Sequence, residues 1–250
     1  MTAATQDIDS KHESIELDAT PSAQTLDKIG EYTVLDRMGD EHTFKSIYDG
    51  PDSDNRVLVV FIRHFFCGSC REFVRALSNT ITPSYLQNLP TPTSIVIIGL
   101  GDPGLIDSYV KQTRCPFPIY VDPTMNLYKD LEMVTSISLG ARPEYFRNCM
   151  ACVVAQSFVN WMKHMGTGLM TKGGNTGQNG AEMLFETGED GKKTVTWFHR
   201  MANARNHTGM PGLRKVLDPE GLVLGKKAWT SIQNMSLKTP EVRIQAGESV

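Results

Sequence analysis

The chain has 250 residues and a formal net charge of −3, with 40% hydrophobic and 21% charged residues. This length is sufficient for one domain with a sizeable core, and the charge shows no basic surface for nucleic acid. No apolar run approaches the ~18 residues that a membrane-spanning helix needs, and residues 1–10 lack the basic and apolar segments of a secretory signal. These features predict a cytoplasmic protein with no nucleic-acid or membrane partner, in which five cysteines are held reduced.

The first part of the chain predicts a tail and then a central strand. Residues 1–27 are polar without clear periodicity, which indicates a flexible N-terminal tail. Short strands are expected at 32–35 and 42–44. Residues 57–62 are apolar without a break, and this run is too short for a helix. It therefore predicts a strand buried on both faces, typical of a parallel sheet.

The middle of the chain predicts alternating helices and strands. After the helix that follows residue 70, a second buried strand is expected at 94–100 and a third at 117–122. A helix between them begins at Asp102-Pro103, where the acidic side chain caps and proline occupies the first turn. The order β-α-β-α-β implies a parallel sheet with right-handed crossovers.

The last part predicts a helical segment, a hairpin and a final helix. Residues 133–170 are expected to be mainly helical, and strands at 182–186 and 194–199 form a hairpin across an Asp-Gly turn. A last helix starts near Pro211. The predicted domain spans 28–220, followed by a C-terminal tail at 221–250.

A Cys-Gly-Ser-Cys motif, Cys67 to Cys70, lies between the central strand and an amphipathic helix. The first N–H groups of a helix lack partners and carry partial positive charge, so a sulfur placed there ionises more easily. The thiolate is the reactive form, and two intervening residues let the second sulfur close a disulfide. Arg63, His64 and Arg71 flank the motif and add positive potential. The pattern predicts a thiol redox site.

Other interpretations of the cysteines stay open. The pair is also compatible with half a zinc site or with buried structural thiols. Cys149-Met-Ala-Cys152 is a second Cys-x-x-Cys, and both pairs together formally make a four-cysteine zinc site. Because residues 148–159 read as continuous helix, we favour small buried hydrophobes at Cys149 and Cys152 over zinc or a disulfide relay. No metal is therefore predicted. Cys115 is either a third redox thiol or a plain loop thiol.

Three blocks of sequence resemble one family. They are Phe61-Ile-Arg-His-Phe-Phe-Cys67-Gly-Ser-Cys70-Arg, then Cys115-Pro-Phe-Pro-Ile-Tyr-Val-Asp-Pro123 with Leu127-Tyr128, then Gly177-Gln178-Asn-Gly180 with His199-Arg200 and His207. In this order they resemble the peroxiredoxin-like 2 type branch of the alkyl hydroperoxide reductase/thiol-specific antioxidant superfamily. The resemblance covers residues 30–220. It implies an α/β fold of the thioredoxin-like (peroxiredoxin-like) kind, with three layers, a central mixed sheet and a helical insertion.

The resemblance also implies an activity. Cys67 would be the attacking thiolate and Cys70 the resolving thiol of an oxidoreductase that reduces a peroxide, a disulfide or another small organic electrophile. A thioredoxin-type dithiol or glutathione would regenerate it, with no cofactor, and a homodimer stays open. Peroxiredoxins proper carry Pro-x-x-x-Thr/Ser-x-x-Cys; here Arg63 stands at the Pro and Cys67 at the Thr/Ser. Glu132 stands where relatives usually have glycine.

The glycine-rich loop before residue 182 should face the thiols by the same resemblance. Gln178 is expected to donate to a bound substrate oxygen, with Gly177 and Gly180 allowing close approach. Arg63 and Arg71 complete the expected substrate-binding set. The alternative for the loop is a flexible connection that contacts nothing.

The two histidines of the third block, His199 and His207, are expected to make structural hydrogen bonds rather than to act in catalysis. Two other functions remain open for the whole chain. One is a specialised biosynthetic-pathway enzyme that acts on one small organic substrate. The other is a non-enzymatic binding module on the same scaffold.

Overall fold

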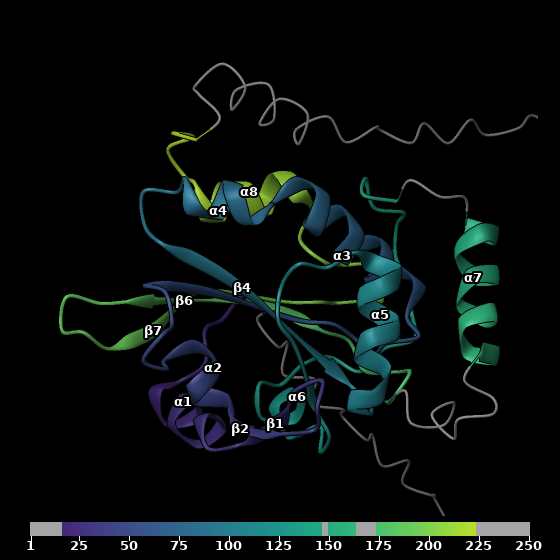
Figure 1. Cartoon of the computed structure of the whole chain (residues 1–250), viewed down its shortest axis with the longest axis horizontal. Helices are drawn as coiled ribbons and strands as arrows, with labels where there is room; N and C mark the ends of the chain where they lie inside the picture. The colour runs from purple at the N-terminus through teal and green to yellow at the C-terminus, as the bar shows by residue number, and fades with distance from the viewer. Residues whose placement is uncertain (1–16, 147–149, 164–173, 224–250) are drawn as a thin grey trace, which may run out of the picture.

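The computed structural model describes residues 17–146, 150–163 and 174–223, in which a mixed sheet lies between two layers of helices (Figure 1). The seven strands of this described sheet are arranged in the order β2-β1-β5-β4-β3-β6-β7. Their bounds are β1 Thr33–Leu35, β2 Glu41–Thr43, β3 Arg56–Phe61, β4 Thr93–Leu100, β5 Ile119–Asp122, β6 Ala181–Thr187 and β7 Lys193–Arg200. Strands β3, β4 and β5 are parallel, and the others join antiparallel. The predicted thioredoxin-like α/β fold with a mixed sheet is confirmed.

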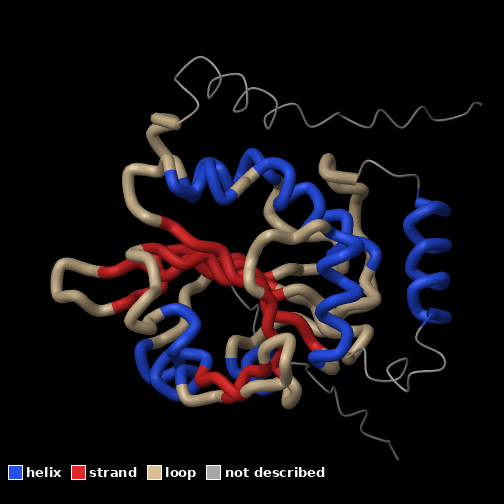
Figure 2. The backbone as a smooth tube through the Cα atoms, viewed as in Figure 1, coloured by secondary structure: helices blue, strands red, loops and turns tan. Residues whose placement is uncertain are grey.

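The helices form the outer layers. Their bounds are α1 Ala23–Gly30, α2 Phe44–Tyr48, α3 Gly68–Thr80, α4 Pro83–Gln87, the 3-10 turn η1 Pro103–Leu105, α5 Ile106–Thr113, α6 Asn126–Asp130, α7 Met150–Lys163 and α8 Met210–Leu217. Figure 1 shows α3, α4 and α8 above the sheet and α1, α2 and α6 below it. Figure 2 shows the strands in red as the layer between these helices. None of the helices in the described ranges has the length and apolar character that crossing a bilayer requires.

Strand β3 is the centre of the molecule. All six of its residues are buried, with β4 parallel on one side and β6 antiparallel on the other. Successive side chains point to opposite faces, so Leu58 and Val60 join the core under α3, whereas Val57, Val59 and Phe61 join the core over α1 and α2. Full burial of such a side chain stabilises the fold by about 1.5–3 kcal/mol. The prediction of a central, fully buried strand is confirmed.

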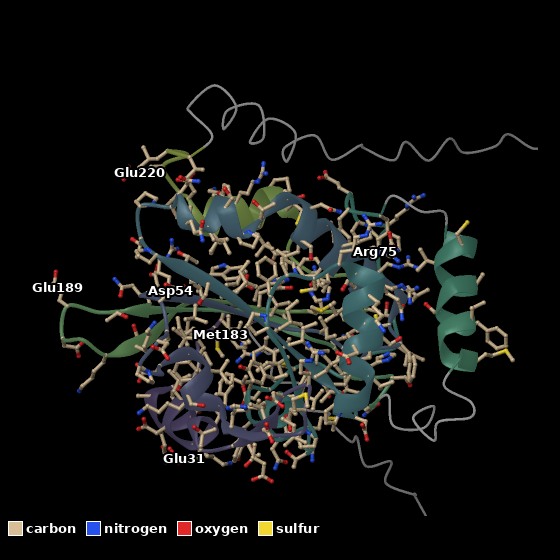
Figure 3. All side chains as sticks on the ribbon, viewed as in Figure 1. Glu31, Asp54, Arg75, Met183, Glu189 and Glu220 are labelled. Atoms are coloured by element: carbon tan, nitrogen blue, oxygen red, sulfur yellow. The ribbon has the colours of Figure 1, made fainter. Side chains whose placement is uncertain are left out.

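The predicted hairpin also exists, as β6 and β7. Its inner part belongs to the core, where Met183 is fully buried, and Glu189 lies at the outer end of the hairpin (Figure 3). Strand β7 alternates between half-buried, exposed and buried positions because it is the sheet edge. The hairpin thus extends the sheet from β3, the strand that leads into the Cys-x-x-Cys motif.

The helical prediction for residues 133–170 is wrong in its first part. Residues 133–146 form an extended, irregular segment, and within the described part of this stretch the helix is α7. The segment pairs with the glycine-rich loop: Thr135 forms an isolated antiparallel bridge with Gln178, and Ser136 N–H donates to the Gly177 carbonyl at 2.8 Å. Long-range pairing therefore decides the conformation of this segment. Residues 164–170 lie outside the described residues.

The N-terminal boundary also differs from the expected tail. Helix α1 begins at Ala23, because the Ser22 hydroxyl accepts the Thr25 N–H at 3.1 Å as an N-cap. Arg200 N–H, at the end of β7, donates to the Leu17 carbonyl at 2.9 Å. Residues 17–27 are therefore part of the fold. The N-terminal residues 1–16 and most of the C-terminal tail, 224–250, lie outside the described residues.

Candidate thiol redox site

Cys67 is the N-cap of α3. Its sulfur accepts the Cys70 N–H at 3.3 Å, so it meets one of the helix N–H groups that lack a helical partner. Cys67 is 5% exposed and Cys70 is fully buried, and both are free thiols. The two sulfurs thus lie at the start of one helix, which follows the central strand in the chain. They are the sulfurs for which the sequence predicts redox chemistry.

Arg63 is the charged group beside these sulfurs. Its Nη1 is 3.7 Å from the Cys67 sulfur, and its main-chain N–H donates to the Cys70 sulfur at 3.4 Å. Two carbonyls of the glycine-rich loop hold the guanidinium in place: Nε donates to Gln178 O at 3.1 Å and Nη2 to Thr176 O. Because Arg63 is 7% exposed, its charge acts on the sulfurs through little water.

The pKa values of the two thiols are shifted in opposite directions. The hydrogen bond from the Cys70 side chain lowers the pKa of Cys67 well below its usual value, against the effect of burial, and the charge of Arg63 adds to the lowering. Burial, together with the neighbouring Cys67 sulfur, raises the pKa of Cys70 well above its usual value. Protonated His64 would also favour the Cys67 thiolate, but burial lowers the pKa of His64 itself. We therefore assign the lasting positive charge to Arg63.

Gln178 reaches the site through its main chain. Its side chain is 3% exposed and its Nε2 donates to Met133 O and to Asn179 O, both at 3.1 Å. Its Oε1 accepts the Thr135 hydroxyl at 3.2 Å. The amide therefore ties the irregular segment to the loop, while the Gln178 carbonyl accepts the Arg63 Nε–H. In this arrangement the amide is occupied by the protein, contrary to the expectation that it donates to a substrate.

The two glycines of the loop differ in how much space a side chain would have there. A Cβ at Gly180 would lie 1.9 Å from the Phe61 carbonyl, so only glycine lets the loop meet the end of β3. A Cβ at Gly177 would have its nearest contact at 3.4 Å, with the Asn175 side chain. Gly180 is thus required by packing, and the substrate-binding role expected for both glycines stays a prediction.

Arg71 lies beneath α7. It is 1% exposed, and its Nη2 donates to Ser157 Oγ at 3.1 Å and to Val153 O at 3.4 Å. Burial lowers the pKa of this guanidinium. A Cβ at Gly68, the first residue of α3, would lie 2.6 Å from Val153 Cγ1. Helix α7 therefore covers the side of the Cys-x-x-Cys turn where Arg71 lies, so a substrate reaches Arg71 only if α7 moves.

The other cysteines lie away from the first pair, in different surroundings from one another. Cys152 is exposed and disulfide-bonded, so the prediction of a small buried hydrophobe is wrong for this residue; Cys149 lies outside the described residues. Cys115 is a free, buried thiol that donates to the Phe117 carbonyl at 3.8 Å, and burial raises its pKa. Among the residues that the structure describes, no group of three or more His, Cys, Asp or Glu is placed to hold a metal ion.

The sequence reasoning missed a buried hydrogen-bonded pair of polar side chains near the site. His207 Nδ1 and the carboxylate of Glu182 form a short hydrogen bond with both side chains fully buried, and Thr208 Oγ1 donates to the same carboxylate at 3.2 Å. The His207 ring stacks on Phe73 of α3, with ring centroids 4.0 Å apart. A signal was present, because Glu182 is the one acidic residue within the otherwise apolar run 181–185. His199 bonds Asp18 and the Asn206 carbonyl, which are structural contacts of the expected kind.

A cavity of about 440 Å³ opens at the carboxyl ends of β4 and β5. Its lining includes Leu100, Asp102, Asp122, Met125, Gly174 and Asn175. The carboxyl edge of parallel strands is the usual place for ligands in open α/β sheets. Because the next residue of the loop, Thr176, bonds Arg63, one loop borders both the cavity and the thiols.

A family model described as AhpC/TSA antioxidant enzyme matches residues 76–203. The chain belongs to this family. The match to the AhpC/TSA family begins after Cys70, so it leaves the Cys-x-x-Cys motif outside the matched region. The site is therefore assigned from geometry. The family match covers residues that follow the motif.

Individual proteins are also similar to this chain. Peroxiredoxin-like 2C of Homo sapiens is 29% identical over 182 residues, which cover 72% of this chain and 74% of the relative. The chloroplastic thioredoxin-like protein AAED1 of Arabidopsis thaliana is 28% identical over 120 residues, covering 48% and 45%. Among solved structures, peroxidoxin BcpB from Mycobacterium tuberculosis aligns with a TM-score of 0.39 and 10% identity, over 88% of this chain and 97% of that one.

Proposed function

We propose that this AhpC/TSA-family protein is a thiol-dependent oxidoreductase, with Cys67 as nucleophile and Cys70 as resolving thiol. The substrate is a peroxide, a disulfide or another small organic electrophile. The observation that carries the proposal is the placement of the Cys67 sulfur at the start of α3, where it accepts the Cys70 N–H at 3.3 Å and lies 3.7 Å from the Arg63 guanidinium. These contacts fit the lowered pKa of Cys67 beside the raised pKa of Cys70. A thiolate beside a thiol that keeps its proton is the state that an attacking and a resolving cysteine need.

For a peroxide ROOH, the Cys67 thiolate attacks the terminal oxygen and the O–O bond breaks. The RO⁻ that leaves takes up a proton as ROH, and Cys67 becomes a sulfenic acid. The Cys70 sulfur then attacks the Cys67 sulfur; the S–O bond breaks and water leaves with the Cys70 proton. The result is a Cys67–Cys70 disulfide, and the peroxide has gained the two electrons. Before the first step the N–H of Cys70 and the guanidinium of Arg63 stabilise the negative charge of the attacking Cys67 thiolate.

For a disulfide substrate, Cys67 attacks one sulfur and the other leaves as a thiolate. Cys70 then displaces the bound half, and both substrate sulfurs leave reduced. Access favours the small members of this substrate class, because Cys67 is only 5% exposed and α7 covers one side of the turn. An external dithiol of the thioredoxin type, or glutathione, returns the Cys67–Cys70 disulfide to thiols. A cytoplasmic location fits this cycle, because thiols are kept reduced there.

A second function has one observation in its favour. The cavity of about 440 Å³ shares its loop with Arg63 and has room for one small organic molecule. This supports a pathway enzyme that uses the same thiol chemistry on a single substrate. A non-enzymatic module gives no reason for two neighbouring free thiols with opposite pKa shifts.

The test is direct oxidation of the protein. The wild type is treated with one equivalent of hydrogen peroxide, tert-butyl hydroperoxide or a small organic disulfide, then alkylated, digested with trypsin and analysed by mass spectrometry. We expect the peptide 64–71 to lose two hydrogens as its two sulfurs bond, with loss of oxidant, and we expect neither in Cys67→Ser. Both thiols alkylated after every oxidant would overturn the proposal.

A further inference from the structure

The Tyr109 hydroxyl is a buried polar group to which the fold gives no hydrogen bond. Tyr109 lies on α5 and is 1% exposed, and its hydroxyl has no partner among the residues that the structure describes. Burying a hydroxyl without a hydrogen bond destabilises a fold. Phenylalanine would fill the same part of the core without this cost, so the hydroxyl indicates a role other than packing.

Tyr109 lies against the start of α3. Its ring meets the ring of Phe65, two residues before Cys67, edge to face with centroids 5.2 Å apart. Three residues further along α5, the side-chain oxygen of Gln112 accepts a hydrogen bond from Arg71 Nη1 at 3.5 Å, and Arg71 comes four residues after Cys67. Residues three apart lie on the same face of a helix. This face of α5 therefore contacts the chain on both sides of Cys67.

The charges around Tyr109 agree with this placement. Burial raises the pKa of the Tyr109 hydroxyl well above its usual value, and the sulfurs of Cys70 and Cys67 add to the rise. The rise has a simple cause, because a phenolate there would be buried near sulfur that carries negative charge. The hydroxyl therefore keeps its proton at neutral pH and can donate a hydrogen bond.

A second donor near Cys67 also lacks an acceptor. Arg71 is 1% exposed, and its two terminal nitrogens bond α5 and α7. Its Nε has no partner within the described part of the chain. The phenol of Tyr109 and the sulfur of Cys67 both act on the pKa of this guanidinium, against the lowering by burial. A compact acceptor, such as an oxygen that carries negative charge, would suit both donors.

We propose that the Tyr109 hydroxyl donates a hydrogen bond to the leaving oxygen of a small hydroperoxide while Cys67 attacks it, so that hydroperoxides are the substrate class of this site. The inference rests on the proposed function, because it concerns the same two thiols. A disulfide releases a sulfur, which is a weak hydrogen-bond acceptor, whereas a hydroperoxide releases an oxygen. A buried hydroxyl near the thiols therefore favours the hydroperoxide. Because Cys67 is only 5% exposed, the substrate is small.

The step balances with Tyr109 as a hydrogen-bond donor that keeps its own proton. The Cys67 thiolate attacks the terminal oxygen of ROOH, an S–O bond forms and the O–O bond breaks. The electron pair of the O–O bond leaves on RO⁻. Cys67 is thereby oxidised to the sulfenic acid, and the peroxide is reduced by two electrons. The hydroxyl of Tyr109 stabilises the charge that develops on RO⁻, which takes a proton from water and leaves as ROH.

The first test removes the hydroxyl and keeps the ring. Wild type and Tyr109→Phe are mixed with hydrogen peroxide or tert-butyl hydroperoxide and quenched at intervals with N-ethylmaleimide, and oxidation of peptide 64–71 is measured by mass spectrometry. We expect the rate in Tyr109→Phe to fall by roughly ten- to a hundredfold, because one donor to a developing oxyanion is lost. The rates with hydroxyethyl disulfide and with iodoacetamide, which release no oxygen, should stay within about twofold of wild type.

Tyr85→Phe is the matched control. Tyr85 on α4 is 8% exposed, and its hydroxyl likewise has no partner among the described residues. Its ring lies 5.6 Å from the guanidinium carbon of Arg214 on α8. Tyr85→Phe should react like wild type with every reagent. Neither variant loses a hydrogen bond that the fold makes, so the melting temperature should fall in neither.

The second test varies the leaving oxygen. Peracetic acid releases acetate, which is a much weaker base than the tert-butoxide that tert-butyl hydroperoxide releases. Acetate therefore needs less stabilisation as it leaves. Tyr109→Phe should slow the reaction with tert-butyl hydroperoxide more than the reaction with peracetic acid, whereas Tyr85→Phe should slow neither. An equal loss with both oxidants would contradict a hydrogen bond to the leaving oxygen.

The outcomes tell this inference and the proposed function apart. If wild type forms the Cys67–Cys70 disulfide with no oxidant, the proposed function fails and the inference fails with it. If wild type reacts with the disulfide reagent alone, or if Tyr109→Phe reacts with hydroperoxides as fast as Tyr85→Phe, the inference alone is overturned. A loss of equal size with hydroperoxides and with iodoacetamide would also overturn it, because the hydroxyl would then act on the Cys67 sulfur.

Discussion

The start of α3 and the start of α7 carry the same Cys-x-x-Cys spacing in different surroundings. Cys67 follows a buried strand, caps its helix, and lies beside the Arg63 guanidinium. Cys152 lies within the first turn of a surface helix, exposed and disulfide-bonded. Spacing alone lets two sulfurs bond; the preceding strand, the cap and a fixed cation make one of them a thiolate. The chemistry of a Cys-x-x-Cys motif therefore depends on the elements and charges around it, more than on the spacing of its cysteines.

Replacing Cys67 should have a much larger effect on turnover than replacing Cys152. Cys67→Ser removes the only sulfur at the site whose pKa is lowered, so we expect substrate turnover to fall to the uncatalysed level. Cys152→Ser should leave the first turnover with peroxide unchanged, since that sulfur is exposed on another helix. Stopped-flow loss of peroxide at equal protein concentration measures both. If both variants lost the same share of their peroxide turnover, the two motifs would not differ in chemistry as described.

A smaller effect is expected from the cation beside Cys67. In Arg63→Met the thiolate loses its nearby positive charge, so the pKa of Cys67 should rise toward its usual value. Because a lowered pKa keeps the thiolate present as the pH falls, the variant should lose reactivity at a higher pH than the wild type does. At a pH below the shifted pKa, we expect iodoacetamide to alkylate Cys67 more slowly by on the order of tenfold.

Arg37→Met is the control for this charge, because Arg37 is 64% exposed and pairs with Asp107 on the surface. Its alkylation profile against pH should match the wild type. A profile for Arg63→Met that also matches would assign the low pKa of Cys67 to the helix start and the Cys70 thiol alone.

Much of this site could be predicted from the sequence because its signals are local. The unbroken apolar run before Cys67 indicated the buried strand, and the helical pattern after Cys70 indicated the cap. Arg63 stands in the sequence as a charge that flanks the motif. Its geometry depends on carbonyls more than 110 residues further along the chain, at Thr176 and Gln178, which no local pattern contains.

The errors of the sequence reasoning have the same origin. A helix is the wrong prediction for residues 133–146, because the bridge between Thr135 and Gln178 gives this segment hydrogen bonds across 43 residues. Glu132 stands where a glycine is usual, and its φ of 54° places it in the left-handed region that glycine prefers. The buried pair of Glu182 and His207 also forms only in the folded sheet. Long-range partners decide the conformation of residues 133–146 and the pairing of Glu182 with His207.

The support of Arg63 leads to the third prediction. In Gln178→Ala the amide that bonds Met133, Asn179 and Thr135 is lost, and their buried polar groups are left without it. We expect the free energy of unfolding to fall by about 1–3 kcal/mol. Reactivity of Cys67 should change less than in Arg63→Met, because the Gln178 carbonyl that holds Arg63 belongs to the main chain.

Gln87→Ala is the matched control for stability, since Gln87 is exposed at the end of α4. Urea unfolding should show a change of less than about 0.5 kcal/mol for it. If Gln178→Ala is as stable as the control but turns over far more slowly, then the amide acts on the substrate and the structural role given to it here is wrong.

The smallest expected effect concerns the contact between the two regions. In Gly68→Ala the new Cβ would lie 2.6 Å from Val153 Cγ1 and 2.7 Å from Ser157 Oγ, which is closer than real Cβ contacts, so these side chains or α7 must shift. Alanine is also the better residue in a helix, by about 1 kcal/mol, so the two effects oppose each other and overall stability should change by less than about 1 kcal/mol.

The change at Gly68 should therefore appear in one region and not in the other. Hydrogen exchange in residues 150–163 should become faster, while alkylation of Cys67 stays within about twofold of wild type, because its bond to the Cys70 N–H belongs to α3 alone. Gly209→Ala is the matched control: Gly209 lies at the start of α8 as its N-cap, and its Cβ would meet Pro211 at an ordinary 3.7 Å. If Gly68→Ala slowed alkylation of Cys67 as much as Arg63→Met does, the thiolate would depend on α7, and the chemistry of the two cysteine regions would be coupled in the resting state.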